Sequence, residues 1–258
     1  MKFADKIDRF VSQMVKKDIL EFYRRTAQQR ERWNRRNRYY HRLLEKYCSF
    51  IIPQGKRVLE IGCSSGDLLN AVKPSYGVGI DFVAEVIEIA KLKYNSLHFD
   101  TDDIENTRLS ETFDYIIISD TLGSLWDAQA AMRNVRRLCH AQTRIVISQY
   151  SFLWEPAIKI LECLGLKQKL PNANWFSNKD VVNLLELEDF QVIKTERKIL
   201  FPLNIPFLSV FLNRFIGNLP ALNRLCLVNL TVARLVPKAD IQASVSIIVP
   251  ARNERGNI

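Results

Sequence analysis

The chain has 258 residues, of which 47% are hydrophobic, and carries a formal net charge of +9 and five cysteines. This length allows one substantial domain with appendages. The odd, scattered cysteines argue against a disulfide framework, and the three histidines show no metal-ligand spacing, so we expect no metal site. The charged start of the chain lacks the apolar core of a signal peptide, which favours a cytoplasmic protein. Association of this protein with a membrane stays open.

Residues 1–50 concentrate the positive charge, with 14 Lys and Arg against 6 Asp and Glu, or +8 of the total +9. Arginines interleaved with tyrosine and tryptophan suit RNA, anionic lipid or an acidic substrate. Trp33, Asn37, Tyr40, Leu44 and Tyr47 recur at helical spacing, so the aromatic rings are expected to pack against the following domain. We predict a basic helical cap over residues 1–50.

An apolar run at residues 58–61 breaks into a loop of small residues that ends at Gly66, and a helix-like run follows. Gly62 can adopt a positive φ and lets a ligand approach the backbone, while Gly66 lets the new helix sit close to its strand. The N-terminus of that helix attracts a carboxylate or phosphate. The loop therefore predicts a nucleotide cradle.

Further apolar runs follow, with helical patterns between them. The predicted strands are residues 77–81, 97–99, 113–120 and 144–148. Apolar runs without alternation are typical of parallel strands covered on both faces, and their alternation with helices favours a doubly wound α/β fold. Ser177 and Asp180 have the spacing of a capping box that opens a helix. Residues 190–200 and 226–236 then read as a strand pair that can be antiparallel.

Residues 50–236 resemble a class I S-adenosylmethionine-dependent methyltransferase. The resemblance is carried by the segment from Glu60 to Gly66, by Asp81, by Asp103 with Ile104, and by residues 113–115 and 119–122. The family usually has a third glycine where this chain has Ser64. The resemblance implies S-adenosylmethionine as cofactor. It also implies a Rossmann-like α/β fold whose mostly parallel seven-stranded sheet has an antiparallel last strand, beside the N-terminal helical cap.

By this resemblance, Glu60, Gly62 and Gly66 surround the methionine moiety, and Asp81 binds the ribose hydroxyls. Asp103 accepts from the adenine amino group, although Asp100 and Asp102 compete with it. Residues at strand ends of an open sheet converge on one crevice, which supports the same assignment. A nicotinamide dinucleotide is the main competitor, but it usually requires a Gly-x-Gly-x-x-Gly loop. The implied donor site comprises Glu60, Gly62, Cys63, Ser64, Gly66, Asp81, Phe82, Asp103, Ile104 and Ser119.

The segment 119–122 lacks the Asn/Asp-Pro-Pro-aromatic signature of methyltransferases that act on amino groups of nucleic acid bases, which favours an oxygen or carbon acceptor. A hydroxyl acceptor can use a general base, for which Asp120, His41 and Tyr150 are candidates. Three functions stay open: methylation of a small sugar- or lipid-linked acceptor, methylation of RNA, and a noncatalytic module that positions a glycosyltransferase.

Residues 199–236 are strongly apolar, but the uncharged run between Lys198 and Arg214 holds 15 residues and includes Pro202 and Pro206. A helix needs about 20 residues to cross a bilayer. We predict an inserted amphipathic segment between the last two strands. It either covers the acceptor pocket, rests on a membrane or packs as a hydrophobic element.

Residues 238–258 read as a linker and a new apolar strand that resembles the start of a family 2 glycosyltransferase. The resemblance implies that Pro250, Asn253 and Glu254 belong to a turn that contacts the nucleotide of a sugar donor. We expect three parts: the cap at 1–50, the methyltransferase domain at 51–237, and a truncated glycosyltransferase start at 238–258, left from a fusion of the two enzymes.

Overall fold

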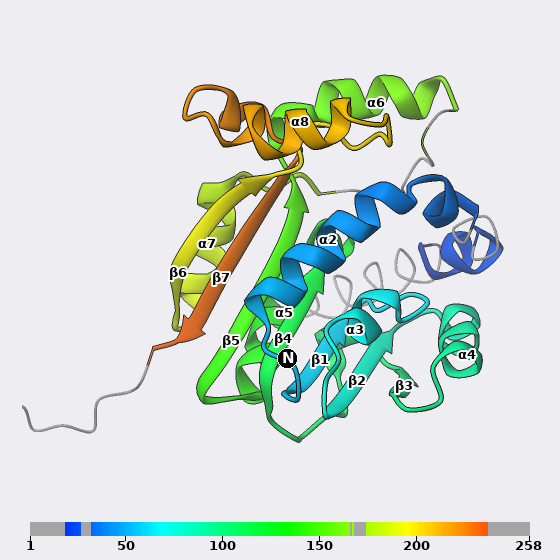
Figure 1. Cartoon of the computed structure of the whole chain (residues 1–258). Helices are drawn as coiled ribbons and strands as arrows, with labels where there is room; N and C mark the ends of the chain where they lie inside the picture. Colours follow the sequence, from blue (N-terminus) through cyan, green and yellow to red (C-terminus); the bar gives the residue numbers. More distant parts are fainter. Residues whose placement is uncertain (1–18, 27–31, 166, 168–173, 237–258) are drawn as a thin grey trace, which may run out of the picture.

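The computed structural model describes residues 19–26, 32–165, 167 and 174–236 (Figure 1). Its centre is a seven-stranded sheet in the order β3-β2-β1-β4-β5-β7-β6. β7 runs antiparallel to β5 and β6, whereas β1 to β5 pair in parallel. This topology confirms the predicted fold. The strands are β1 (Arg57–Ile61), β2 (Tyr76–Asp81), β3 (His98–Thr101), β4 (Phe113–Ser119), β5 (Cys139–Tyr150), β6 (Phe190–Lys198) and β7 (Val228–Leu235).

Helices cover both faces of the sheet because its central strands are apolar on both sides. In β4, Ile116 and Ile118 pack with helices α5 and α7, while Ile117 packs on the opposite face with α2, α3 and α4. The apolar runs without alternation are explained by this two-sided burial. The helices are α2 (Arg38–Ile51), α3 (Asp67–Ala71), α4 (Ala84–Lys93), α5 (Ala128–Arg137), α6 (Glu155–Cys163), α7 (Asn178–Leu187) and α8 (Leu208–Arg214).

Short 3₁₀ turns connect several of these elements, and residues 19–26 and 32–36 are also helical. The 3₁₀ turns are η1 (Ile104–Asn106), η2 (Leu122–Ser124), η3 (Phe152–Trp154), η4 (Ile216–Asn218) and η5 (Leu222–Leu225). In Figure 1, α6 and α8 are both drawn beyond the same ends of β5, β6 and β7. Among the described residues, we find no helix with the length and hydropathy needed to cross a bilayer.

The capping box that begins α7 is confirmed. Ser177 Oγ accepts from the Asp180 N–H at 3.2 Å, and Asp180 Oδ2 accepts from the Ser177 N–H at 2.8 Å. β5 differs from the prediction because it begins at Cys139 instead of Arg144. Its polar first half is held by Thr143, whose hydroxyl donates to the Phe113 carbonyl at 2.6 Å, and such a tertiary contact leaves no apolar run in the sequence.

Candidate functional site

The loop after β1 folds tightly against the ends of β2 and β4. Gly62 has φ +73°, and its N–H donates to the Ile80 carbonyl at 2.8 Å. A Cβ at Gly62 would lie 2.2 Å from Thr121 Oγ1, so only glycine permits this approach. Ser64 adopts φ +48°, which places a non-glycine residue in the left-handed region where the resembled family usually has glycine.

Asp81, at the end of β2, ties that strand to the loop after β1. The residue is 2% exposed. Oδ1 accepts from the Val83 N–H at 3.0 Å, and Oδ2 accepts from the Ser64 N–H at 3.1 Å. Two backbone donors therefore fix the carboxylate at the carboxyl edge of the sheet, where it can still accept from a hydroxyl group.

Glu60 lies one residue before the end of β1 and is almost completely buried. Its Oε2 accepts from the Leu69 N–H, in the first turn of α3, at 2.9 Å. Burial raises the pKa of Glu60 well above its ordinary value; the Leu69 N–H opposes this rise, and the charges of Asp67 and Asp81 add to it. The side chain thus positions α3 and keeps a titratable carboxyl group inside the site.

The raised pKa of Glu60 predicts a pH-dependent stability of the protein without ligand. Between the ordinary and the raised pKa, the folded protein holds a proton that the unfolded chain releases, so the free energy of unfolding decreases as pH rises through this window. Glu60→Gln keeps an oxygen that accepts from the Leu69 N–H but cannot titrate. In this variant the free energy of unfolding should decrease less as pH rises. Urea unfolding of both proteins between about pH 5 and about pH 8 checks this. Equal slopes would contradict it.

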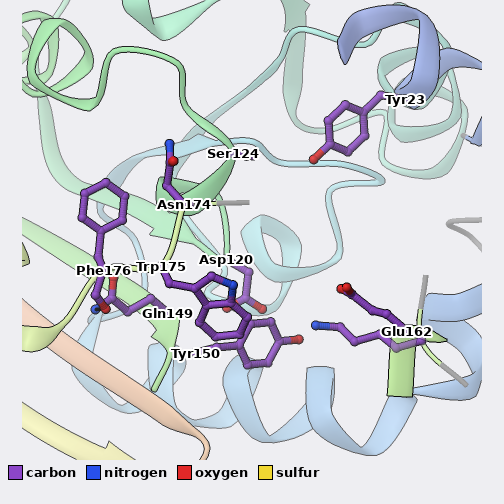
Figure 2. A pocket seen from close by; sticks show the side chains of 11 residues that line it. Tyr23, Asp120, Ser124, Gln149, Tyr150, Glu162, Asn174, Trp175 and Phe176 are labelled. Atoms are coloured by element: carbon purple, nitrogen blue, oxygen red, sulfur yellow. Dashed lines mark hydrogen bonds between the residues drawn. The ribbon is translucent and has the colours of Figure 1, made fainter. Parts of the chain in front are cut away.

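Three cavities open at the carboxyl edge of the sheet. The first, of about 570 Å³, is the Asp81 cavity, lined by Ile19, Asp81, Phe82, Asp103, Ile104 and Trp126 among others. The second, of about 580 Å³, is the Glu60 cavity, lined by Arg38, His41, Glu60, Cys63, Ser64 and Ser119 among others. The third is the Tyr150 cavity, of about 70 Å³, whose walls include Asp120, Gln149, Tyr150, Lys167, Trp175 and Phe176 (Figure 2).

The three cavities adjoin one another through shared wall residues. Gly62 lines both the Asp81 and the Glu60 cavities. Asp120 lines the Glu60 and Tyr150 cavities, and Ser124 lines the Asp81 and Tyr150 cavities. These residues follow β1 and β4, the two central neighbouring strands of the sheet. The cavities therefore surround one junction at the carboxyl ends of these strands.

Nine of the ten residues predicted for the donor site lie on these walls. Glu60, Gly62, Cys63, Ser64 and Ser119 line the Glu60 cavity, and Gly62, Asp81, Phe82, Asp103 and Ile104 line the Asp81 cavity. Within the described chain, Gly66 is not among the lining residues of the three cavities. It is the N-cap residue of α3, and a Cβ there would lie 2.5 Å from the Phe99 ring, so its missing side chain permits the close packing of helix on sheet that the sequence predicted.

The structure distinguishes Asp100, Asp102 and Asp103, the three candidates for contact with an adenine amino group. Asp102 accepts from the N–H groups of Asp103 and Arg108 and from the Thr107 hydroxyl, so its carboxylate organises the turn. Asp103 accepts from the Glu105 N–H at 2.9 Å and caps η1. Both line the Asp81 cavity, whereas Asp100 does not appear on its wall in the described chain.

The helices that precede the sheet cover both large cavities. Ile19 and Leu20 line the Asp81 cavity, and Tyr23 packs edge-on against Phe82 with ring centroids 5.3 Å apart. Helix α2 lines the Glu60 cavity with Arg38 and Arg42, while its Tyr40, Leu44 and Cys48 are buried. Tyr40 and Leu44 of the predicted helical pattern thus pack inward, whereas Trp33 and Tyr47 are part-buried.

Asp120 is held by a residue that lies 80 positions earlier in the chain. Tyr40 Oη donates to Asp120 Oδ2 at 2.7 Å, and the Tyr40 ring stacks on Tyr150 with centroids 5.7 Å apart. Lys167 Nζ lies 4.2 Å from the centroid of Tyr150. Burial raises the pKa of both phenols and lowers that of Lys167. Sequence analysis missed Lys167 and Trp175 at this site, because no local pattern marks either residue.

Comparisons with known proteins bear on the family and the fold of the chain. The model of a family described as a methyltransferase domain matches residues 28–195. Malonyl-[acyl-carrier protein] O-methyltransferases from Bacillus anthracis and Bacillus cereus are 35% identical over 85 residues, which is 31% of this chain and 32% of each relative. The chain thus spans about a third of the length of the curated relatives it matches.

Solved structures share the fold. An S-adenosylmethionine-dependent methyltransferase from Thermotoga maritima superposes with a TM-score of 0.65 at 17% identity and covers 84% of this chain and 99% of its own. Magnesium protoporphyrin IX methyltransferase from Synechocystis, with bound S-adenosylhomocysteine, gives a TM-score of 0.59 at 16% identity, over 86% of this chain and all of its own. At these identities the likeness establishes the fold alone.

Proposed function

The chain belongs to the family of methyltransferase domains and is an S-adenosylmethionine-dependent enzyme, and from this premise we propose which cavities hold the donor and the acceptor. The adenosine part of the donor occupies the Asp81 cavity, and its methionine part occupies the Glu60 cavity. The acceptor presents an oxygen atom in the Tyr150 cavity. The observation that carries this proposal is the junction at which Gly62, Asp120 and Ser124 each line two of the three cavities.

The residues of both large cavities fit the two halves of the donor. Each cavity has a volume typical of small-molecule sites, about 300–1,000 Å³. Asp81 and Asp103 offer carboxylate oxygens to hydroxyl and amino groups, and Ile104 offers an apolar wall to a ring. Around the Glu60 cavity, Arg38 and Arg42 suit the carboxylate of an amino acid, and Glu60 suits its ammonium group, which favours the ionised glutamate.

In the proposed mechanism, the protein aligns the acceptor and receives its proton. The bound cofactor supplies an electrophilic methyl group. Asp120 Oδ2, held by Tyr40, is placed to accept the proton of an acceptor hydroxyl, and alignment contributes much of the rate. Tyr150 stays protonated because burial raises its pKa, so it donates a hydrogen bond to the acceptor instead of removing a proton. His41 lines the Glu60 cavity and is not among the described residues that line the Tyr150 cavity, whereas Asp120 lines both, which favours Asp120 as the base.

Calorimetry with S-adenosylmethionine tests the donor assignment. We expect Asp81→Ala to weaken binding by about 1.5–3 kcal/mol, or roughly 10- to 100-fold, since a buried hydrogen bond to a charged group is lost. Asp114→Ala is the matched control: this carboxylate also accepts a backbone N–H, from Arg57 at 2.9 Å, but at the opposite end of β4. Unchanged affinity in Asp81→Ala, or tighter binding of a nicotinamide dinucleotide to the wild type, would contradict the assignment.

For the acceptor we propose an oxygen nucleophile on a small molecule that a lipid, sugar or carrier bears. The names of the Bacillus relatives support this proposal, since they state O-methyl transfer to a carrier-linked acyl group. RNA is the alternative acceptor, favoured by the arginine-rich cap. A steep decrease of RNA affinity with salt would support that alternative, and no RNA binding at low salt would remove it. Because the family identifies an enzyme, we do not retain the noncatalytic module.

The predicted glycosyltransferase start, residues 238–258 with Pro250, Asn253 and Glu254, lies outside the described residues. The family match ends at residue 195 and does not extend to it. A fusion with a glycosyltransferase, and with it a glycosyltransferase partner domain, therefore remains a prediction from sequence.

A further inference from the structure

Helix α8 turns its polar side chains toward the protein and its apolar side chains toward solvent. Ser209 is buried, and its hydroxyl donates to the Leu203 carbonyl at 2.5 Å and accepts from the Ile205 N–H at 2.7 Å. Asn213 donates to the Phe201 carbonyl at 2.8 Å and accepts from the Phe201 N–H at 2.9 Å. A surface helix of a globular protein has the reverse arrangement.

The outward face of α8 and of the turn before it presents three phenylalanines. Phe207, Phe211 and Phe215 follow one another at a spacing of four residues, which places them along one side, and they are 91%, 52% and 57% exposed. Phe207 has φ +62° and ψ −49°, and the Leu208 N–H donates to the Pro206 carbonyl at 2.7 Å. This is the rare, strained form of γ-turn, and the chain holds it while projecting an aromatic ring into solvent.

Helix α6 and the turn η3 extend this apolar face. Trp154 Nε1 donates to the Leu225 carbonyl at 2.9 Å and ties η3, which leads into α6, to η5, and Figure 1 draws α6 and α8 at the same end of the sheet. Exposed apolar patches of this kind mark interaction sites in folded proteins. We call this face the apical surface; it includes Phe152, Ile160, Leu164, Phe207, Phe211 and Phe215, all more than half exposed.

The charge around the apical surface identifies its partner. Residues 199–236 contain no Asp or Glu. Arg214 of α8 and Arg224 of η5 are exposed beside this surface, whereas Arg234 lies at the far end of β7, where its guanidinium donates to Gln191. Of the acids of α6, Glu155 pairs with Lys159 of the same helix at 2.6 Å, and Glu162 lines the Tyr150 cavity. Apolar rings beside basic side chains suit an interface of acyl chains and anionic headgroups. Two copies meeting face to face would bring arginines together, which disfavours self-association.

We propose that the apical surface docks on a membrane that contains anionic lipid. α6 exposes Ile160 and Leu164 to this surface while Glu162 and the nearby Lys167 line the Tyr150 cavity. Asn213 also donates to Tyr39 Oη of the adjoining α2 at 3.3 Å. The docked face thus adjoins both the acceptor cavity and the cap. It follows, resting on the proposed function, that the acceptor reaches the Tyr150 cavity from the lipid phase.

Flotation with phosphatidylcholine vesicles, with and without phosphatidylglycerol, tests the docking. We expect the wild type to float with the anionic vesicles, and the double variant Phe207→Ser, Phe211→Ser to lose at least about tenfold in affinity. Phe50→Ser is the matched control, since this ring is 88% exposed on α2 outside the apical surface, and it should bind as the wild type does. Arg214→Glu should weaken binding and its dependence on the anionic lipid without removing an apolar side chain.

Absence of binding to anionic vesicles, or equal binding by the double variant and Phe50→Ser, would overturn the proposal. So would a wild-type dimer in sedimentation that the double variant abolishes, because the apical surface would then belong to a second copy. Calorimetry with S-adenosylmethionine on the same preparations separates the two proposals. Donor binding that persists without vesicle binding removes the docking alone, and vesicle binding without donor binding removes the donor assignment alone.

Discussion

Replacing Gly62 by alanine is expected to lower the free energy of unfolding by about 2–5 kcal/mol and to abolish detectable donor binding. Two effects add. The positive φ of +73° disfavours any residue with a Cβ, and that Cβ would lie 2.2 Å from Thr121 Oγ1 and 2.7 Å from Thr121 Cγ2. The collision pushes the loop after β1 away from the end of β4, at the place where the Asp81 and Glu60 cavities adjoin.

Gly55→Ala separates the collision from the backbone strain. Gly55 has nearly the same positive φ, +77°, but no atom lies within 4 Å of a Cβ built there. This variant should lose only about 1–2 kcal/mol and bind S-adenosylmethionine as the wild type does. Urea unfolding and calorimetry on the two variants measure the difference. Equal destabilisation of the two variants would contradict the collision with Thr121. Donor binding by Gly62→Ala would contradict the placement of the donor across Gly62.

Asp120→Asn is expected to lower kcat by about 10²- to 10⁴-fold while S-adenosylmethionine still binds, because the amide cannot accept the acceptor's proton. The substitution preserves the local structure. Asparagine tolerates the left-handed backbone that Asp120 adopts at φ +53°, and its amide oxygen can accept the Tyr40 hydrogen bond. The measurement is the transfer of a labelled methyl group from S-adenosylmethionine to material extracted from membranes.

Tyr40→Phe provides the graded comparison for Asp120→Asn. It removes the hydroxyl that positions the carboxylate but leaves the ring stacked on Tyr150, so kcat should decrease less than in Asp120→Asn. Activity of Asp120→Asn within twofold of the wild type would show that proton transfer to Asp120 is not needed. The alignment of donor and acceptor would then carry the reaction without a base.

The sequence was sufficient for the sheet, and it predicted many of the residues that line the Asp81 and Glu60 cavities, because both depend on local patterns. Apolar runs mark strands buried on both faces, and parallel strands place their carboxyl ends at one edge, so Glu60, Asp81 and Ser119 converge although they are distant in the chain. Gly66 was predicted to let the following helix sit close to the sheet, and a Cβ there would indeed lie 2.5 Å from the Phe99 ring; its contact with the ligand, implied by family resemblance, stays a prediction.

The Tyr150 cavity was less predictable because its residues meet only in the tertiary structure. Tyr40 reaches Asp120 across 80 residues, and Lys167 and Trp175 approach Tyr150 from a segment without a motif. The sequence predicted the apolar insertion between the last two strands, but it did not predict which face of α8 is exposed. The exposed face is determined by the hydrogen bonds of Ser209 and Asn213 with the preceding loop, and such bonds leave no periodic signal in the sequence.

A crystal structure of the protein with S-adenosylhomocysteine tests the central claim most directly. The account predicts that the adenosine lies in the Asp81 cavity with its ribose hydroxyls on Asp81, that the ligand passes Gly62, and that the amino acid end lies in the Glu60 cavity. A nucleoside bound outside these two cavities, or a junction at Gly62 closed by a protein side chain, would contradict it.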